Sequence, residues 1–344
     1  MRLTMKDRYS ILKKLAEAYG PSSAEDKTRE VIKEILGDEY TFLETAHGNL
    51  ISWHTESYSK KAEDNSNVLM LQAHMDELGF RPEKYLDNGV IKIAPLSHVP
   101  LAVDNQSLIF QPGNQMGILA VDNQSKPPKY HLDIGADSAK TAEEKIPYYA
   151  VGTYTSKFRE TDTDITCKSL DDRVGCALII ESMQKAAQKK NYPFVLGVFT
   201  TREETGNWPM PELGHKIREF SLTPKMFINL EVCPGGPSYD NSKAFIQGGE
   251  GVGLVHMERH YAASSKLCQF MVETARDNEI SHQQVAMRDG GGEIGAIAFE
   301  LGVRGYSYVV PGRYMHSPNS AICKKDYEAA FSMLKAVMER GELP

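Results

Sequence analysis

Val68-Leu-Met-Leu-Gln-Ala-His-Met-Asp-Glu-Leu-Gly79 is the stretch that decides the fold of this 344-residue chain. Its first four residues are apolar, and its charged and histidine side chains come only near its end. An apolar run of this length predicts a buried strand of a parallel sheet. Open α/β sheets carry their functional residues at the carboxyl ends of such strands. Because side chains alternate along a strand, we expect His74 and Asp76 on one face and Glu77 on the other.

Helical and strand patterns alternate along most of the remaining chain. Helices are expected near residues 5–19, 31–36, 172–189, 264–278, 296–301 and 325–340, and strands within 40–53, 194–200, 226–230 and 306–310. Strands that alternate with helices predict an α/β fold with a mixed sheet flanked by helices. A serine three residues before an acid, at Ser22 or Ser23, predicts a capping box for the second helix.

A middle segment has a different character. From Phe80 to about Ile165 the helical periodicity disappears, and short apolar stretches are separated by Gly, Pro, Asn and Asp. This pattern predicts a small all-β barrel or sandwich. We therefore expect one α/β domain, residues 1–79 and 164–344, that is split by an inserted β-barrel domain of residues 80–163.

Composition and charge limit the possible partners. The formal net charge of −7 argues against nucleic acid or an anionic membrane as the main partner. The chain has no run of 18 apolar residues, and its first residues lack the apolar core of a secretion signal. Its five cysteines are scattered and odd in number, which is typical of reduced thiols. We expect a cytoplasmic protein without a membrane or nucleic-acid partner.

Acids and histidines follow the predicted strands or stand where a loop meets a helix. These residues are His74, Asp76, Asp171, Asp172, Glu203, Glu204, Glu231 and His316. Imidazole and carboxylate ligands suit zinc, cobalt or manganese. Several unpaired carboxylates that converge at one sheet edge would repel one another without a cation. We interpret the set as a metal centre.

Each residue also has a structural interpretation. His74 could be a hydrogen-bonded core histidine, and Asp171 could simply cap the helix that begins there, which is a frequent role of aspartate. Glu203 and Glu204 could be solvated loop acids. Their adjacency favours the chemical interpretation, because two neighbouring acids cannot fill one coordination position. One carboxylate can bind a metal while the other accepts a proton from the water bound to that metal. Metal-assisted hydrolysis needs both of these roles.

Four motifs occur in an order that resembles a known family. They are His74-Met-Asp-Glu-Leu-Gly-Phe80, Leu170-Asp-Asp-Arg173, Glu203-Glu-Thr-Gly206 and Arg313-Tyr-Met-His-Ser-Pro318, with supporting matches at Gly20-Pro-Ser22 and Asp133-Ile-Gly-Ala-Asp-Ser138. They resemble the tetrahedral and glutamyl aminopeptidase family, which are dinuclear metallopeptidases of clan MH. The resemblance covers nearly the whole chain and implies the zinc-peptidase-like form of the α/β fold.

The resemblance implies five metal ligands for two divalent ions, zinc, cobalt or manganese. His74 and His316 would bind one ion each, and Asp171 would bridge both. Glu204 would complete one site and Glu231 the other. All five positions match the motifs or follow a predicted strand.

The resemblance also implies the catalytic roles. Glu203 would be the general base and acid, and Asp76 would orient His74 from behind the metal. A cis peptide is implied between Asp171 and Asp172.

These roles describe an aminopeptidase. A hydroxide that bridges two metals about 3.5 Å apart would attack the first carbonyl of a peptide with a free N-terminus. Glu203 would take the water proton and give it to the leaving amine. The inserted barrel would mediate homo-oligomerisation, up to the dodecamers of the family. Two alternatives stay open: a deacylase or amidase of the same clan acting on a specialised small amide, and a metal-binding paralogue without turnover.

Three positions depart from the family pattern. Glu231 stands where the family usually has the shorter Asp, and Gly290-Gly-Gly-Glu293 stands where it has Gly-Gly-Thr-Asp. Trp208 follows the Glu203 motif in place of small residues. These departures leave the substrate preference open.

Three arginines bear on that preference. Arg202, Arg288 and Arg313 could pair with an acidic side chain of the substrate or form structural ion pairs.

Overall fold

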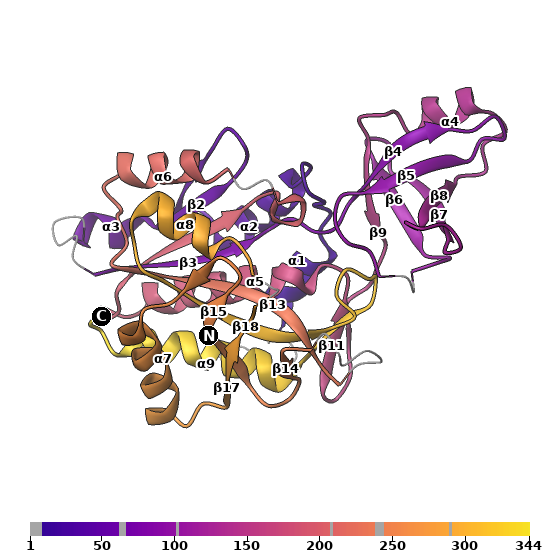
Figure 1. The fold of residues 1–344 in the computed structure, drawn as a ribbon. Helices are drawn as coiled ribbons and strands as arrows, with labels where there is room; N and C mark the ends of the chain where they lie inside the picture. The colour runs from indigo at the N-terminus through magenta and orange to yellow at the C-terminus, as the bar shows by residue number, and fades with distance from the viewer. Residues whose placement is uncertain (1–8, 62–66, 101–102, 207–208, 238–243, 289–290) are drawn as a thin grey trace.

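The computed structural model describes residues 9–61, 67–100, 103–206, 209–237, 244–288 and 291–344. It shows one large mixed sheet with helices on both faces and a separate closed β-barrel at one side (Figure 1). The predicted fold class is therefore confirmed, including the inserted barrel.

In the described ranges, the helices are α1 (Ser10–Glu17), α2 (Asp26–Leu36), α3 (Thr55–Lys61), α4 (Ala139–Lys145), α5 (Leu170–Ala187), α6 (Met210–Glu219), α7 (Ser265–Asp277), α8 (Ile294–Leu301) and α9 (Lys324–Glu339). The first strands are β1 (Tyr40–Glu44), β2 (Leu50–His54), β3 (Val68–His74), β4 (Phe80–Tyr85), β5 (Ile91–Pro95), β6 (Ser107–Gln111), β7 (Gln115–Asp122), β8 (Lys129–Asp133) and β9 (Val151–Tyr154). The later strands are β10 (Arg159–Glu160), β11 (Asp164–Cys167), β12 (Phe194–Thr200), β13 (Met226–Gly236), β14 (Ile246–Gln247), β15 (Val252–Glu258), β16 (Tyr261–Ala262), β17 (His282–Ala286), β18 (Gly305–Arg313) and β19 (Ser320–Cys323).

Four parallel strands form the centre of the large sheet. Its main order is β1-β2-β12-β3-β13-β18-β19-β11-β10, and β12, β3, β13 and β18 pair in parallel. All seven residues of β3 are buried, as its apolar sequence predicts. Because parallel strands point the same way, their carboxyl ends share one edge of the sheet.

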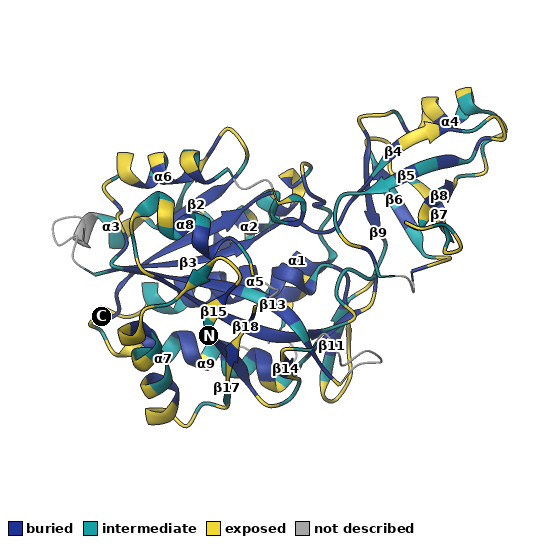
Figure 2. Ribbon diagram, in the orientation of Figure 1, coloured by how far each residue is buried: buried dark blue, intermediate teal, exposed yellow. Residues whose placement is uncertain are grey.

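Two layers of helices cover the large sheet. Leu69, Leu71 and Ala73 of β3 face a core that includes residues of α1, α2, α5 and α9. Val68 and Met70, on the opposite face, pack in a core that includes residues of α6 and α8. Figure 2 shows the buried strands between helices whose outer faces are exposed. The alternation along β3 buries both faces, which explains why the strand is apolar nearly throughout.

The inserted segment closes into a barrel with the strand order β4-β5-β8-β7-β6-β9. It has a hydrophobic core of its own, with Phe80, Phe110, Leu119 and Tyr154 among its buried members. The chain then returns to the large sheet through β10 and β11, and β11 pairs with β19. The barrel strands therefore extend from Phe80 to Tyr154.

Local details at the start of the chain differ from the prediction. The capping box is wrong: α2 begins at Asp26 after Glu25, and no side chain caps it. The hydroxyl of Ser22 instead donates to Asp76, 54 positions later, because the chain before α2 packs against the end of β3. No helix in the described part of the chain is long and apolar enough to cross a bilayer.

Candidate metal centre

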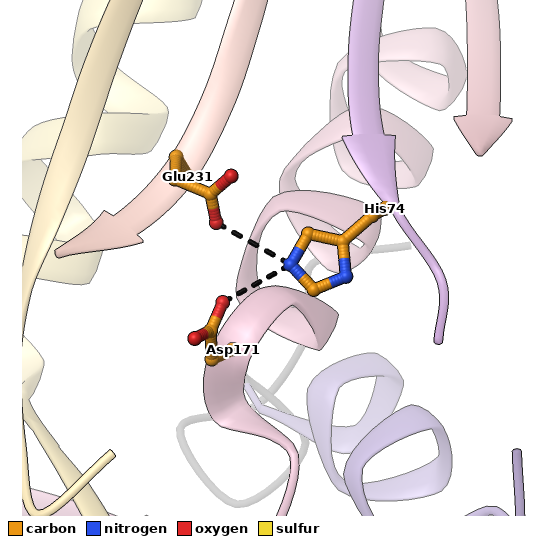
Figure 3. A group of neighbouring side chains, drawn as sticks. All are labelled: His74, Asp171 and Glu231. Atoms are coloured by element: carbon orange, nitrogen blue, oxygen red, sulfur yellow. Dashed lines mark hydrogen bonds and ion pairs between the residues drawn. The ribbon is translucent and has the colours of Figure 1, made fainter. Parts of the chain in front are cut away.

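Three of the predicted ligands meet at the edge of the sheet (Figure 3). His74 ends β3, Glu231 lies in β13, and Asp171 lies at the start of α5. His74 Nε2 is 3.1 Å from Asp171 Oδ1 and 3.5 Å from Glu231 Oε1. One ligand atom of each residue lies within 4.8 Å of the other two, so the three side chains can contact one common cation.

The other two predicted ligands form a second group with the same aspartate. His316 Nε2 is 3.4 Å from Asp171 Oδ2 and 3.2 Å from Glu204 Oε2. Asp171 therefore directs one carboxylate oxygen to each histidine. The ligand atoms of Asp171, Glu204 and His316 also lie within 4.8 Å of one another. The structure brings all five residues together as two groups of three that share Asp171.

The first turn of α5 positions the shared aspartate. Asp171 and Asp172 have non-helical backbone angles, and the implied cis peptide between them is confirmed. Asp172 is fully buried, and its Oδ1 accepts a hydrogen bond from Gly175 N at 2.8 Å. Asp172 thus supports the turn, while Asp171 points to the two histidines.

Asp76 holds the turn that carries Glu203 and Glu204. Its Oδ1 accepts from Glu203 N at 3.1 Å, and its Oδ2 accepts from Glu204 N at 3.2 Å. The Ser22 hydroxyl also donates to Oδ2, at 2.5 Å. His74 Nδ1 lies 3.3 Å from Asp76 Oδ1. The fully buried Asp76 therefore supports both glutamates and lies beside the imidazole.

The surroundings raise the pKa of both glutamates among the predicted ligands. Burial raises the pKa of Glu204 to about 7, and the Asp171 charge adds to the rise. Burial and the Asp171 charge also raise the pKa of Glu231 to about 7. Burial alone would lower the pKa of His316, but the charge of Glu204 and the contact with Asp171 raise it to about 10.

This donor set fits divalent metal ions. Two imidazoles and three carboxylates are the ligands that zinc, cobalt and manganese accept. Positive charge at the centre would hold the glutamates as anions and remove their mutual repulsion. Asp172 Oδ2, beside the shared aspartate, is buried without a hydrogen-bond partner among the described residues.

Glu203 lies in the same turn as Glu204 but belongs to neither ligand group. Burial raises the pKa of its carboxyl well above the usual range, and the charges of Glu231, Glu293 and Glu204 add to the rise. A carboxyl with a raised pKa is suited to take up and release a proton near neutral pH.

Two supporting contacts were not identified from the sequence. His316 Nδ1 donates to the backbone carbonyl of His98, in the inserted segment, at 2.8 Å, which leaves Nε2 free to bind a metal. Glu77, which lies beyond the end of β3, accepts from Lys168 Nζ at 2.6 and 2.7 Å. The Gly20-Pro-Ser22 motif had already drawn attention to Ser22, which contacts Asp76. The contact of His316 with the His98 carbonyl could not be read from the sequence, because every residue has a backbone carbonyl.

Three of the residues left open with respect to substrate preference are Arg313, Glu293 and Trp208. Arg313 forms an ion pair with Asp164. Glu293 is buried and accepts from Gln72 Nε2 at 2.5 Å. Trp208 lies outside the described residues.

Comparison with known sequences identifies the relationship. The sequence model of the M42 glutamyl aminopeptidase family matches residues 56–333. A lysyl aminopeptidase from Pyrococcus furiosus is 24% identical over 356 aligned residues, which cover 96% of this chain and 96% of that protein.

Two solved structures share the fold. A TET aminopeptidase from the marine sediment archaeon Thaumarchaeota archaeon SCGC AB-539-E09 has a TM-score of 0.84, 24% identity and 96% coverage of both chains. The TET1 peptidase of Pyrococcus horikoshii, which can assemble into a tetrahedron or a large octahedral shell, has a TM-score of 0.77 and 20% identity. That match covers 96% of this chain and 98% of the other.

Proposed function

Because this chain belongs to the M42 glutamyl aminopeptidase family, whose peptidases are metal-dependent, we propose that it removes N-terminal residues from peptides with two divalent ions bound. The observation that carries this proposal is the position of Asp171, whose two carboxylate oxygens face two separate groups of ligands. His74 and Glu231 would complete one metal site, and Glu204 and His316 the other. Zinc, cobalt and manganese all suit these ligands.

The side chains around the ligands would carry the proton transfers. When bound, the two ions would supply Lewis acidity and make water acidic enough to lose a proton near neutral pH. Glu203 would accept that proton and later give it to the departing amine, which is consistent with its raised pKa. Asp76 holds the Glu203 backbone and would keep this carboxyl in place.

Metal removal tests the proposal. Protein treated with a chelator should lose activity on amino-acid p-nitroanilides and regain it with zinc, cobalt or manganese. N-acetylated versions of the same substrates should not be cleaved, because an aminopeptidase requires the free amine. Activity that is indifferent to the chelator, or preference for acetylated substrates, would contradict the proposal.

Glu203→Gln tests the proton transfer separately. Turnover should fall by about 10²–10⁴-fold, the usual contribution of a general base. Metal content should stay unchanged, because Glu203 is in neither ligand group. Glu144→Gln, which changes an exposed acid of α4, is the matched control. Normal turnover in the Glu203 variant would remove this residue from the mechanism.

Assembly and location are further parts of the proposed function. We infer that the protein forms homo-oligomers through its inserted barrel, in assemblies as large as dodecamers. The support is the fold shared with a self-assembling peptidase and the exposed apolar side chains on the barrel. All five cysteines are free thiols, which supports a cytoplasmic location.

A further inference from the structure

A cavity of about 660 Å³ opens beside the predicted metal ligand His316. Pro100 and Val103 of the inserted segment, Pro234 of β13 and Met315 of the loop after β18 contribute apolar walls. The volume lies within the range of small-ligand sites, which are mostly apolar with a few polar groups. The cavity is therefore large enough for a side chain of a substrate held at the metal centre.

Two residues of opposite charge in the described lining of this cavity are paired with each other. The described lining contains two side chains of the Asp, Glu, Lys or Arg type. They are Asp164 and Arg313, and they form an ion pair with each other. The second oxygen of Asp164 accepts from Thr163 Oγ1 at 2.7 Å. Both side chains are partly buried, each 24% exposed. Among the described lining residues, neither a glutamyl nor a lysyl side chain would meet an unpaired Asp, Glu, Lys or Arg of opposite charge, so entry would cost desolvation without compensation from them.

We propose that this cavity binds an apolar side chain next to the scissile bond, so that the enzyme prefers substrates with N-terminal leucine, methionine or phenylalanine. This inference rests on the proposed aminopeptidase function and adds the substrate class. The Asp164–Arg313 pair would set the preference, because each of the two charges is already paired with the other.

Substrate selectivity is the first measurement. In a panel of p-nitroanilides, kcat/KM for leucine, methionine or phenylalanine should exceed that for glutamate and lysine by at least about tenfold. Asp164→Asn leaves Arg313 unpaired and should raise the glutamate-to-leucine ratio of kcat/KM by about tenfold or more. Arg313→Gln leaves Asp164 unpaired and should raise the lysine-to-leucine ratio instead.

A matched control separates the cavity from general effects of charge. Glu160→Gln removes a neighbouring ion pair, with Lys324 at 3.0 Å, whose residues do not line the cavity. This variant should keep the selectivity of the unmodified protein. Thermal unfolding of each variant shows whether the fold is retained, and because the two cavity variants must shift selectivity in opposite directions, either one that folds tests the proposal.

Binding gives a test that does not depend on turnover. Calorimetry with the metal-loaded protein should show tighter binding of free leucine than of glutamate or lysine, with glutamate gaining affinity in the Asp164 variant. Unchanged ratios in both variants, with normal cleavage of leucine substrates, would overturn the cavity assignment and leave the aminopeptidase function intact. Loss of every peptidase activity, with leucine binding retained, would instead contradict the proposed function alone.

Discussion

At the residue scale, the position of Glu231 depends on a glycine. A Cβ atom on Gly292 would lie 2.9 Å from Glu231 Oε2. Gly292 does not have a positive φ, so its backbone conformation alone does not demand glycine. Glu258 Oε2 accepts from Gly292 N at 2.9 Å and fixes the loop at this distance. The missing side chain therefore makes room for the carboxylate that reaches His74.

Gly292→Ala should weaken metal binding without unfolding the protein. The added methyl group would displace the flexible end of Glu231, and affinity at its metal site should fall by about tenfold or more. Calorimetric titration of the metal-free protein with zinc measures this change. In a Glu231→Asp background, the same substitution should add little, because the shorter side chain ends farther from the loop.

Gly295→Ala provides the control for this loop-to-helix segment. Its Cβ would lie 3.2 Å from the His260 carbonyl oxygen rather than beside a predicted ligand. Metal affinity should therefore remain unchanged. If the effects of the Gly292 and Glu231 substitutions simply add, Gly292 does not act through Glu231.

At the element scale, β3, β12 and the start of α8 are joined by one buried polar cluster. Gln72 of β3 donates to Thr200 Oγ1 of β12 at 3.0 Å and to Glu293 Oε2, and the Thr200 hydroxyl also donates to Glu293. Burial raises the pKa of Glu293 to about 8, against the lowering effect of the bond from Thr200. A neutral acid therefore holds the first residues of α8 against the sheet.

The raised pKa predicts a pH dependence of stability. Between pH 4.5 and about 8, Glu293 keeps its proton in the folded protein, whereas the unfolded chain has released it. The contribution of Glu293 to the free energy of unfolding is therefore fully present below pH 4.5 and is lost as the pH rises to about 8. At 1.36 kcal/mol per pKa unit, the loss is at most about 5 kcal/mol. Glu293→Gln, which stays neutral, should lack this loss.

Urea denaturation of the metal-free proteins at pH 5 and pH 8.5 measures the difference. The variant should gain stability relative to the unmodified protein at the higher pH. Glu219→Gln, an exposed acid at the end of α6, should leave the pH dependence as it is. Parallel curves for the unmodified and Glu293 proteins would show that Glu293 does not titrate as expected.

At the scale of the whole molecule, the barrel carries a surface suited to association. It extends from one side of the large sheet (Figure 1). Four of its large apolar side chains, Met116, Ile118, Tyr148 and Tyr149, are exposed, the last by 70%. Met116 and Ile118 are two residues apart in β7 and so face the same side of that strand. Burial of such side chains between subunits would stabilise an oligomer.

Ile118→Glu combined with Tyr149→Glu should shift the protein to smaller species. Sedimentation velocity at micromolar concentration should detect oligomers of the unmodified protein and their loss in the variant, because buried charges oppose association. Phe299→Glu is the control, since Phe299 is 87% exposed on α8, outside the barrel. A monomeric unmodified protein, or a variant that assembles normally, would contradict association through the barrel.

The sequence by itself determined the fold class and the residues that gather at the sheet edge. Apolar strands such as Val68–His74, the helical repeats and the glycine-punctuated segment are local patterns, and burial of both sheet faces requires them. Parallel strands end at one edge, and β3 and β13 are neighbours in the sheet, so His74 and Glu231 lie near each other. The capping box predicted from the local sequence is absent, because the Ser22 hydroxyl donates to Asp76 beyond the end of β3.

Only the tertiary structure decided how those residues act on one another. Packing placed the two oxygens of Asp171 between two histidines, and paired Arg313 with Asp164 across 149 positions of sequence. It also brought the His98 carbonyl to His316, 218 positions away, and the bare backbone of Gly292 to Glu231. Sequence periodicity records which face of an element is buried, whereas these contacts depend on the distances between elements that pack together after folding.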